Sequence, residues 1–158
     1  MFERHQQHLA TPSDIQHHLP LLFSLAKGNV LELGTRSGVS TAALLAGVER
    51  HGGHVWSMDI EDCSQVAAGH RQWTFIQGDS RDVNLAEEFT KARTHRFYFD
   101  LILIDTFHSY EQSTAELSLW GLLVTPGGTI CMHDTETFPG VRRAAQEFAD
   151  KHGWPITF

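Results

Sequence analysis

Short hydrophobic runs alternate with amphipathic segments along most of the chain. The runs that predict strands are 29–33, 54–58, 73–77, 97–104 and 129–132. Helical spacing is found in 40–50, 85–94 and 141–151, and in a segment that starts with a capping pattern at Ser109 and buries Leu117, Trp120 and Leu122. Because strands and helices alternate, we expect an α/β fold with a doubly wound, mainly parallel sheet.

The two ends of the chain have weaker patterns. Thr11-Pro12-Ser13-Asp14 has the pattern of a helix N-terminus, and apolar residues follow at helical spacing, so we expect an opening helix with Pro20 as a kink. Residues 156–158 are expected to begin a sixth strand. Histidines are dense near the start, which is more typical of surface residues than of a metal-binding tract. They are His5, His8, His17 and His18.

The composition predicts one soluble domain. Twelve Lys and Arg stand against 19 Asp and Glu among 158 residues, giving a net charge of −7. No basic run is present, so we expect no nucleic acid and no membrane among its partners. No apolar stretch approaches the roughly 20 residues of a membrane span, and the two cysteines are far apart, which favours a cytoplasmic protein with reduced thiols. We expect a single domain, 1–158, in which a helical segment, 1–27, precedes a ligand-binding core, 28–158.

Acidic residues lie at or next to the ends of the first five predicted strands. In a doubly wound sheet the ligand binds beyond the carboxyl ends of the strands, near the point where the strand order reverses. The residues at these ends are Glu32 to Gly34, Asp59, Asp79, Asp105 and His133-Asp134. The sequence therefore predicts a row of carboxylates along the edge that binds the ligand.

The turn after the first strand contains glycine but not the dinucleotide fingerprint. G-x-G-x-x-G starting at Gly34 would need glycine where Arg36 and Val39 stand, so a pyrophosphate is not the expected ligand. Backbone amides and carbonyls of such a turn, assisted by Glu32, suit a nucleoside that carries a zwitterionic amino-acid tail. That description fits S-adenosylmethionine.

Two later strand ends are expected to bind the nucleoside. Asp59 is placed to accept hydrogen bonds from the ribose hydroxyls. Asp79 would bind the adenine amine while Ser80 lines the ring. Simpler interpretations exist for both, because Asp59 would also serve as a loop acid or helix cap, and Gly78-Asp79-Ser80 would also form an ordinary turn.

Residues 30–41, Val-Leu-Glu-Leu-Gly-Thr-Arg-Ser-Gly-Val-Ser-Thr, resemble the first motif of class I S-adenosylmethionine-dependent methyltransferases. Segments 99–105, 108–111, 126–128 and 133–134 are similar to one branch, the macrolide sugar O-methyltransferases and cephalosporin-hydroxylase-like proteins. The similarity spans about Asn29 to Phe148 and implies a Rossmann-like fold. The cofactor contacts implied besides the acids named above are Gly34, Thr35, Arg36, Gly38, Ser40, Thr41, Ile60 and Asp105.

The resemblance also implies a metal site and a catalytic base. Members of this branch use an acid after strand four and an acidic pair after strand five, so Asp105, His133 and Asp134 would hold Mg²⁺ or Mn²⁺. His133 stands where a carboxylate often stands, so it either supports the ligands from outside or favours a softer metal. His108, with Asp105, would act as the base on a hydroxyl. The plainer interpretations are a surface histidine at 108 and a loop cap at 133–134.

The expected function is metal-assisted O-methylation of a small hydroxylated metabolite or sugar by direct displacement. Arg36, Phe107 and Tyr110 would border the acceptor. The alternative is an S-adenosylmethionine-binding module without transfer activity, favoured because no residues follow Phe158 to form the usual seventh strand. The exposed sheet edge would favour a homodimer. A nicotinamide dehydrogenase lacks its glycines, and a hydroxylase lacks an evident two-histidine iron site.

Overall fold

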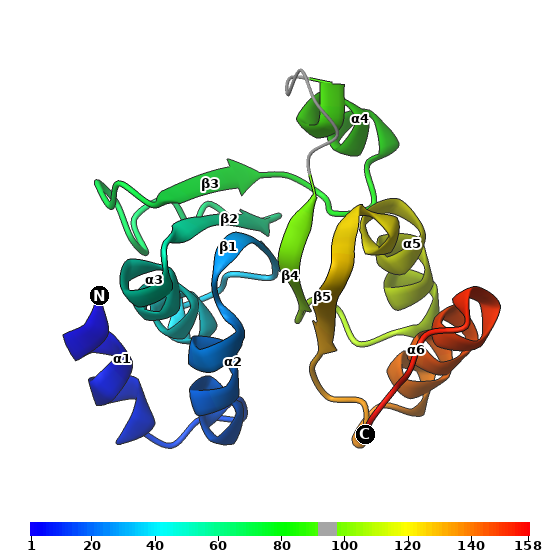
Figure 1. Cartoon of the computed structure of the whole chain (residues 1–158), viewed down its shortest axis with the longest axis horizontal. Helices are drawn as coiled ribbons and strands as arrows, with labels where there is room; N and C mark the ends of the chain where they lie inside the picture. The colour runs from blue at the N-terminus through cyan, green and yellow to red at the C-terminus, as the bar shows by residue number, and fades with distance from the viewer. Residues whose placement is uncertain (92–97) are drawn as a thin grey trace.

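The computed structural model describes residues 1–91 and 98–158 and contains one five-stranded sheet (Figure 1). All four strand pairings are parallel, and the order is β3-β2-β1-β4-β5. The strands are β1 Gly28–Leu33, β2 Gly53–Asp59, β3 Trp73–Gln77, β4 Phe99–Ile104 and β5 Val124–Met132. The doubly wound parallel sheet predicted from the sequence is confirmed.

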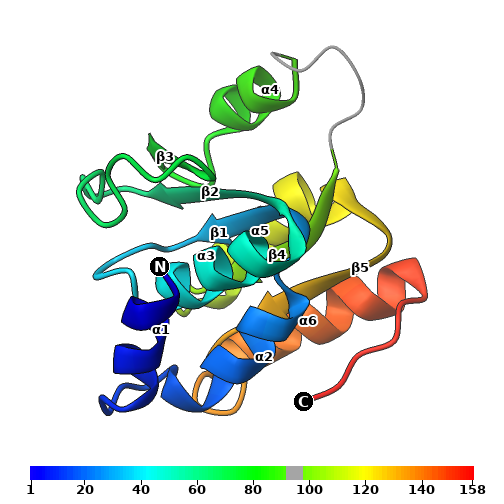
Figure 2. The same cartoon turned by 60° about the vertical axis from the view of Figure 1, so that its left-hand side comes forward.

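Helices cover both faces of the sheet (Figures 1 and 2). On one side lie α1 Phe2–Leu9, α2 Leu19–Leu25 and α3 Val39–His51. On the other lie α4 Val83–Lys91, α5 Tyr110–Trp120 and α6 Pro139–His152. Short 3₁₀ helices at Gln16–His18 and Gly121–Leu123 precede α2 and β5.

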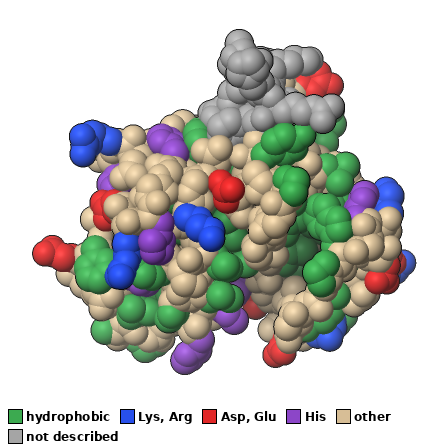
Figure 3. All heavy atoms as spheres, viewed as in Figure 1, with side chains coloured by type: hydrophobic (Ala, Val, Ile, Leu, Met, Phe, Trp, Pro, Cys, Tyr) green, Lys and Arg blue, Asp and Glu red, His purple; other side chains and the backbone are tan. Residues whose placement is uncertain are grey.

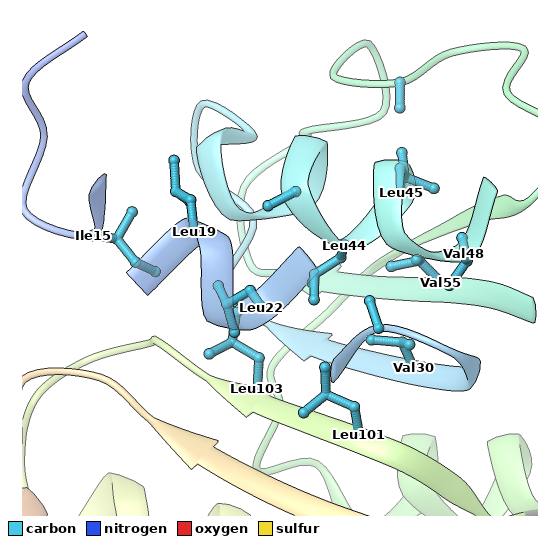
Figure 4. Close-up of a cluster of buried hydrophobic side chains, with 13 residues drawn as sticks. Ile15, Leu19, Leu22, Val30, Leu44, Leu45, Val48, Val55, Leu101 and Leu103 are labelled. Atoms are coloured by element: carbon cyan, nitrogen blue, oxygen red, sulfur yellow. The ribbon is translucent and has the colours of Figure 1, made fainter. Parts of the chain in front are cut away.

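Side-chain alternation along the strands divides the core into two clusters. In β1, Val30 belongs to the cluster under α2 and α3, whereas Leu31 and Leu33 belong to the cluster under α5 and α6. Figure 4 shows the first cluster, in which leucines of α2 and α3 meet β1, β2 and β4. Buried Trp120 and Phe99 fill the second. Because both faces are covered, the central strands β1, β2 and β4 bury side chains on both sides.

The strand order reverses between β1 and β4. From β1 the chain proceeds outward to β2 and β3, and it then returns to place β4 on the other side of β1. The carboxyl ends of β1 and β4 therefore form the topological switch point, where a doubly wound sheet binds its ligand.

Several predicted boundaries at the ends of the chain are wrong. Residues 11–15 form no helix, and Pro20 lies in the first turn of α2, where its missing N–H has no intrahelical partner to lose, so it makes no kink. Helix α1 was not predicted. Residues 156–158 form no strand. Leu122 is exposed rather than buried, because the chain leaves α5 before reaching it. The predicted positions 92–94 and 97 lie outside the described residues.

A cavity of about 660 Å³ lies between β5, α6 and the C-terminal residues. Hydrophobic side chains gather around a hollow on the right-hand half of the face shown in Figure 3. The lining includes Ile130, Phe148 and Trp154 but no titratable side chain, so this cavity offers no acid or base. No helix among residues 1–91 and 98–158 combines the length and apolar character needed to cross a bilayer.

Candidate active site at the switch point

The pairing of β4 with β5 brings Asp105 and His133 together. Ile104 is in register with Met132, so the next residue of each strand emerges at the same edge. The hydrogen bonds between neighbouring strands continue for one residue beyond the ends of β4 and β5. The N–H of Asp105 donates to Leu33 O at 2.8 Å, and the N–H of His133 donates to Ile104 O at 3.1 Å. Two side chains 28 positions apart are thus fixed side by side by main-chain hydrogen bonds.

Four side chains converge at this edge in a ring of alternating nitrogen and oxygen atoms. His133 Nδ1 lies 3.3 Å from Asp105 Oδ1 and 3.3 Å from Asp134 Oδ2. His108 Nε2 lies 3.4 Å from the same Asp105 oxygen and 3.3 Å from the same Asp134 oxygen. We call these four residues the His–Asp cluster. The atoms of Asp105, His108 and His133 are close enough together to hold one metal ion.

Burial and charge shift the pKa values within the cluster. Burial alone would raise the pKa of Asp105, but contact with His133 and then with His108 lowers it below its usual value. Contact with Asp105 raises the pKa of His133 in spite of its burial, and Asp134 adds to the effect. The cluster is therefore a place where two carboxylates stabilise positive charge, whether on an imidazole or on a cation.

The first turn, 34–38, lies next to the cluster. Gly34 has a φ of +95°, and a Cβ at this position would collide with the carbonyl oxygen of Asp105. Only glycine allows this backbone approach. Gly38, with a φ of +80°, then caps the N-terminus of α3. The glycine-bearing turn predicted from the sequence is present, and it contacts the end of β4.

Asp59 lies beneath the first turn. Its Oδ2 accepts hydrogen bonds from the N–H of Thr35 at 2.8 Å and of Arg36 at 2.9 Å, and its Oδ1 accepts from the N–H of Glu61 at 3.0 Å. Burial would raise the pKa of Asp59, but these backbone hydrogen bonds lower it. Asp59 therefore stays ionised, with the exposed Ile60 following it at the end of β2. Its assignment to the ribose, and that of Ile60 to the cofactor, stay predictions.

Glu32 is fully buried beneath the start of α3. Its carboxylate accepts hydrogen bonds from Ser40 Oγ at 2.7 Å, from Thr41 Oγ1 at 2.8 Å and from Ser57 Oγ at 2.5 Å. Burial raises the pKa of Glu32 to about 7, although the three hydroxyls oppose the shift. The hydroxyls of Ser40 and Thr41, predicted to contact the cofactor, are used here to join α3 to β1 and β2.

Asp79 and Ser80 point in different directions after β3. Asp79 pairs with Arg81, whose Nη2 lies 2.8 Å from Oδ2, and this bond lowers the pKa of Asp79. The buried Ser80 donates to Glu116 Oε1 at 2.5 Å and accepts from Gln112 Nε2 at 3.1 Å. The partly exposed Asp79 stays a candidate for the adenine amine, whereas the hydroxyl of Ser80 is part of an internal network.

A family model described as a methyltransferase domain matches residues 31–135, which include the end of β1, the first turn and the His–Asp cluster. The chain belongs to this methyltransferase family. No curated protein matched the sequence. The match covers both the turn that was compared with the first motif and the strand ends that carry the cluster.

Solved structures show that this methyltransferase domain has the class I fold. MycE from mycinamycin biosynthesis, in complex with Mg, SAH and mycinamycin VI, has a TM-score of 0.66 at 22% identity. The alignment covers 89% of this chain and 39% of MycE, so the chain spans about two fifths of that protein. CalS11, a TDP-rhamnose 3′-O-methyltransferase of calicheamicin biosynthesis, has a TM-score of 0.65 at 17% identity, and the alignment covers 99% of this chain and 88% of CalS11. An O-methyltransferase from Bacillus cereus in complex with SAH has a TM-score of 0.64 at 19% identity, and the alignment covers 94% of this chain and 76% of that enzyme.

The methyltransferase domain has two features near the cluster that sequence reasoning missed. Phe138 stacks on His108 with a centroid distance of 4.7 Å, and His18 meets His133 edge-on at 5.5 Å. Phe107, which precedes His108 in the sequence, is largely exposed, whereas Tyr110 donates its hydroxyl to Glu147. The loop after β5 and the N-terminal segment therefore both border the cluster.

Glu116 is the buried acid that the sequence analysis did not single out. It accepts hydrogen bonds from Ser80, Gln112 and Thr106, and burial raises its pKa. A signal was available, because Gln112, Glu116 and Trp120 lie four residues apart on one face of a helix predicted to bury Trp120. A carboxylate on the buried face of a helix needs partners, and here they come from the ends of β3 and β4.

Proposed function

We propose that this domain transfers a methyl group from S-adenosylmethionine to a hydroxyl of a small acceptor such as a sugar or a hydroxylated metabolite. The observation that carries the proposal is the position of His108. Its Nε2 lies within 3.4 Å of the carboxylates of Asp105 and Asp134, and the backbone of that same Asp105 packs against Gly34 of the first turn. A base and the expected donor-binding turn thus meet where the fold binds ligands. O-methyltransferases among the structural neighbours support the choice of oxygen as acceptor.

The residues at the first turn fit the methyl donor. The absence of a side chain at Gly34 lets the turn pack directly on the backbone of Asp105, which holds the main-chain groups of the turn at the ligand-binding edge of the sheet. Asp59, ionised and fixed by three backbone N–H groups, retains lone pairs that can accept from ribose hydroxyls. Asp79 lies at the next strand end, where the base of the nucleoside would lie.

The residues of the cluster also fit a divalent cation. Among the described residues His133 Nδ1 has no hydrogen-bond partner, although it is buried and lies between two carboxylate oxygens. Asp105, His133 and Asp134 would hold the ion. A bound cation would supply positive charge that lowers the pKa of the acceptor hydroxyl and fixes its direction.

In the reaction, His108 accepts the hydroxyl proton at Nε2, and Asp105 and Asp134 stabilise the imidazolium that results. The acceptor oxygen forms its bond to the methyl carbon as the carbon–sulfur bond breaks in line. The electron pair of that bond stays on sulfur, which leaves as a neutral thioether and needs no acid. Most of the rate gain comes from holding the two substrates at reacting distance. Phe138, stacked on His108, keeps the imidazole oriented.

The test measures ligand binding and methyl transfer separately. Titration calorimetry of the full chain with S-adenosylmethionine, S-adenosylhomocysteine and NAD should show binding of the first two only. Formation of S-adenosylhomocysteine (SAH) is then measured with a panel of hydroxylated sugars and metabolites as acceptors. His108→Gln should reduce turnover by about 100-fold or more, and its affinity for SAH should equal that of wild type.

The matched control is His17→Gln, an exposed histidine of the N-terminal segment, which should turn over like wild type. Binding of NAD in place of the methyl donor would contradict the proposal. Donor binding with undiminished turnover in His108→Gln would remove the base. Donor binding without transfer to any hydroxyl on the panel would favour a binding module over an enzyme.

A further inference from the structure

The nitrogen of His133 distinguishes the cluster from an all-oxygen cation site. The His133 side chain is 7% exposed, and its Nδ1 finds no hydrogen-bond partner among the described residues. A buried, unpaired imidazole nitrogen is costly unless something else occupies its lone pair. Carboxylate oxygens of Asp105 and Asp134 lie 3.3 Å from this nitrogen, close enough to attract positive charge, but neither forms a hydrogen bond of good geometry with it.

The spacing of these atoms matches ligands around one ion. Metal–nitrogen and metal–oxygen bonds of 2.0–2.2 Å separate neighbouring ligand atoms by roughly 3 Å. Asp105 Oδ1 and Asp134 Oδ2 each lie 3.3 Å from His133 Nδ1, so small side-chain movements would bring all three onto one ion. The edge-on ring of His18 covers His133 from the N-terminal side.

The donor chemistry then decides which ion is preferred. Mg²⁺ favours oxygen ligands and water, whereas imidazole suits the later first-row cations, whose affinity for nitrogen donors rises along the series. We propose that Asp105, His133 and Asp134 bind a late first-row cation, of the group Fe²⁺, Co²⁺, Ni²⁺ and Zn²⁺, in preference to Mg²⁺. This inference rests on the proposed function for the role of the ion but not for its binding.

His108 is assigned to the base rather than to the metal. Its side chain is 27% exposed against 7% for His133, and its ring stacks on the exposed Phe138 at the rim of the cluster. A nitrogen bound to a cation cannot accept a proton, so Nε2 of the base must not be bound to the ion. The division of roles between the two histidines is therefore part of the proposal.

The experiment measures cation binding to the full chain without methyl donor or acceptor. After treatment with chelator, wild type is titrated with Co²⁺, Zn²⁺ and Mg²⁺ by calorimetry, and Co²⁺ is followed also by its visible absorption. Wild type should bind Co²⁺ and Zn²⁺ at least about 100-fold more tightly than Mg²⁺. His133→Asp, which replaces nitrogen by oxygen, should reduce that preference at least about 10-fold.

Two matched variants and one spectrum complete the test. His108→Gln and His17→Gln should both keep the wild-type preference, the latter excluding binding by surface histidines. Long-range ¹H–¹⁵N spectra of wild type should show Zn²⁺ shifting a nitrogen of His133 and leaving Nε2 of His108 unshifted, which decides the ligand even if His133→Asp fails to fold.

The proposal is overturned if wild type binds Mg²⁺ as tightly as Co²⁺, if His133→Asp keeps the preference, or if His108→Gln loses it. Each of these readings is independent of methyl transfer. Failure of the proposed function would instead appear as lack of donor binding or turnover in a protein that still selects Co²⁺ and Zn²⁺.

Discussion

The buried carboxyl of Glu32 should make the stability of this protein fall as the pH rises. Burial raises the pKa of Glu32 from 4.5 to about 7 in the folded state. Because the folded protein holds this proton more tightly than the unfolded chain, its contribution to stability is complete below about pH 4.5 and is lost as the pH passes 7. The difference between the two pKa values corresponds to about 3 kcal/mol.

Glu32→Gln isolates this contribution because the amide does not ionise. Its single oxygen can still accept from Thr41 and Ser57, and its NH2 group can donate to the Ser40 hydroxyl, which then accepts instead of donating. We expect the free energy of unfolding of wild type to decline relative to the variant by about 3 kcal/mol between pH 4.5 and pH 8. The measurement is urea denaturation followed by tryptophan fluorescence at intervals of half a pH unit. Subtracting one curve from the other removes the histidines and the remaining acids.

Glu61→Gln, at an exposed position of the loop after β2, serves as the control and should follow wild type at every pH. The reasoning would be refuted if the curves of wild type and Glu32→Gln ran parallel, even with a constant offset. A parallel pair would mean that Glu32 keeps its solution pKa and that the three hydroxyls compensate fully for its burial.

Three further changes test other parts of the site. Gly34→Ala should destabilise the fold by at least about 2 kcal/mol and lower the melting temperature, because its Cβ would collide with the carbonyl of Asp105; an unchanged melting temperature would count against that contact. Asp59→Ala, which leaves three backbone N–H groups of the turn region without their acceptor, should weaken SAH binding by about 10-fold or more in calorimetry. Trp73→Phe removes the indole hydrogen bond to Ser57 and should cost about 1 kcal/mol in urea denaturation, whereas equal stability would indicate that water replaces it.

The regular part of the fold was predictable because the central strands β1, β2 and β4 are hydrophobic on both faces and helices such as α4 and α6 are hydrophobic on one. The N-terminus was not, because α1 buries His5, whose ring stacks on Phe23 at 5.2 Å, and a hydrophobicity pattern counts histidine as polar. The C-terminal run was hydrophobic without forming a strand. Phe158 packs under the guanidinium of Arg142 at 3.7 Å, so the run is stabilised by contact with α6 rather than by pairing with β5.

The position of the site was predictable for a geometric reason, since parallel strands end at one edge and bring Asp105 and His133 there whatever their separation in sequence. Which polar groups pair within the site was not predictable. Ser80 and Glu116 are 36 positions apart, and their hydrogen bond depends on how deeply α5 packs. The sequence analysis expected Asp105, His133 and Asp134 at one edge with His108 next to Asp105, but a two-histidine iron site was not evident from the sequence, because the two histidines follow different strands, β4 and β5.

The contact between Gly34 and the end of β4 has a consequence for how such a domain changes over evolutionary time. The distance between the first turn, which is expected to bind the methyl donor, and the end of β4, which is followed by the expected base, is set by a contact between main-chain atoms. No side chain that could be substituted takes part in it. Loops that carry neither the first turn nor the His–Asp cluster can therefore be exchanged, lengthened or recombined to accommodate new acceptors while the alignment of the two reactants is inherited unchanged. A domain built in this way can diversify its substrates without rebuilding its chemistry.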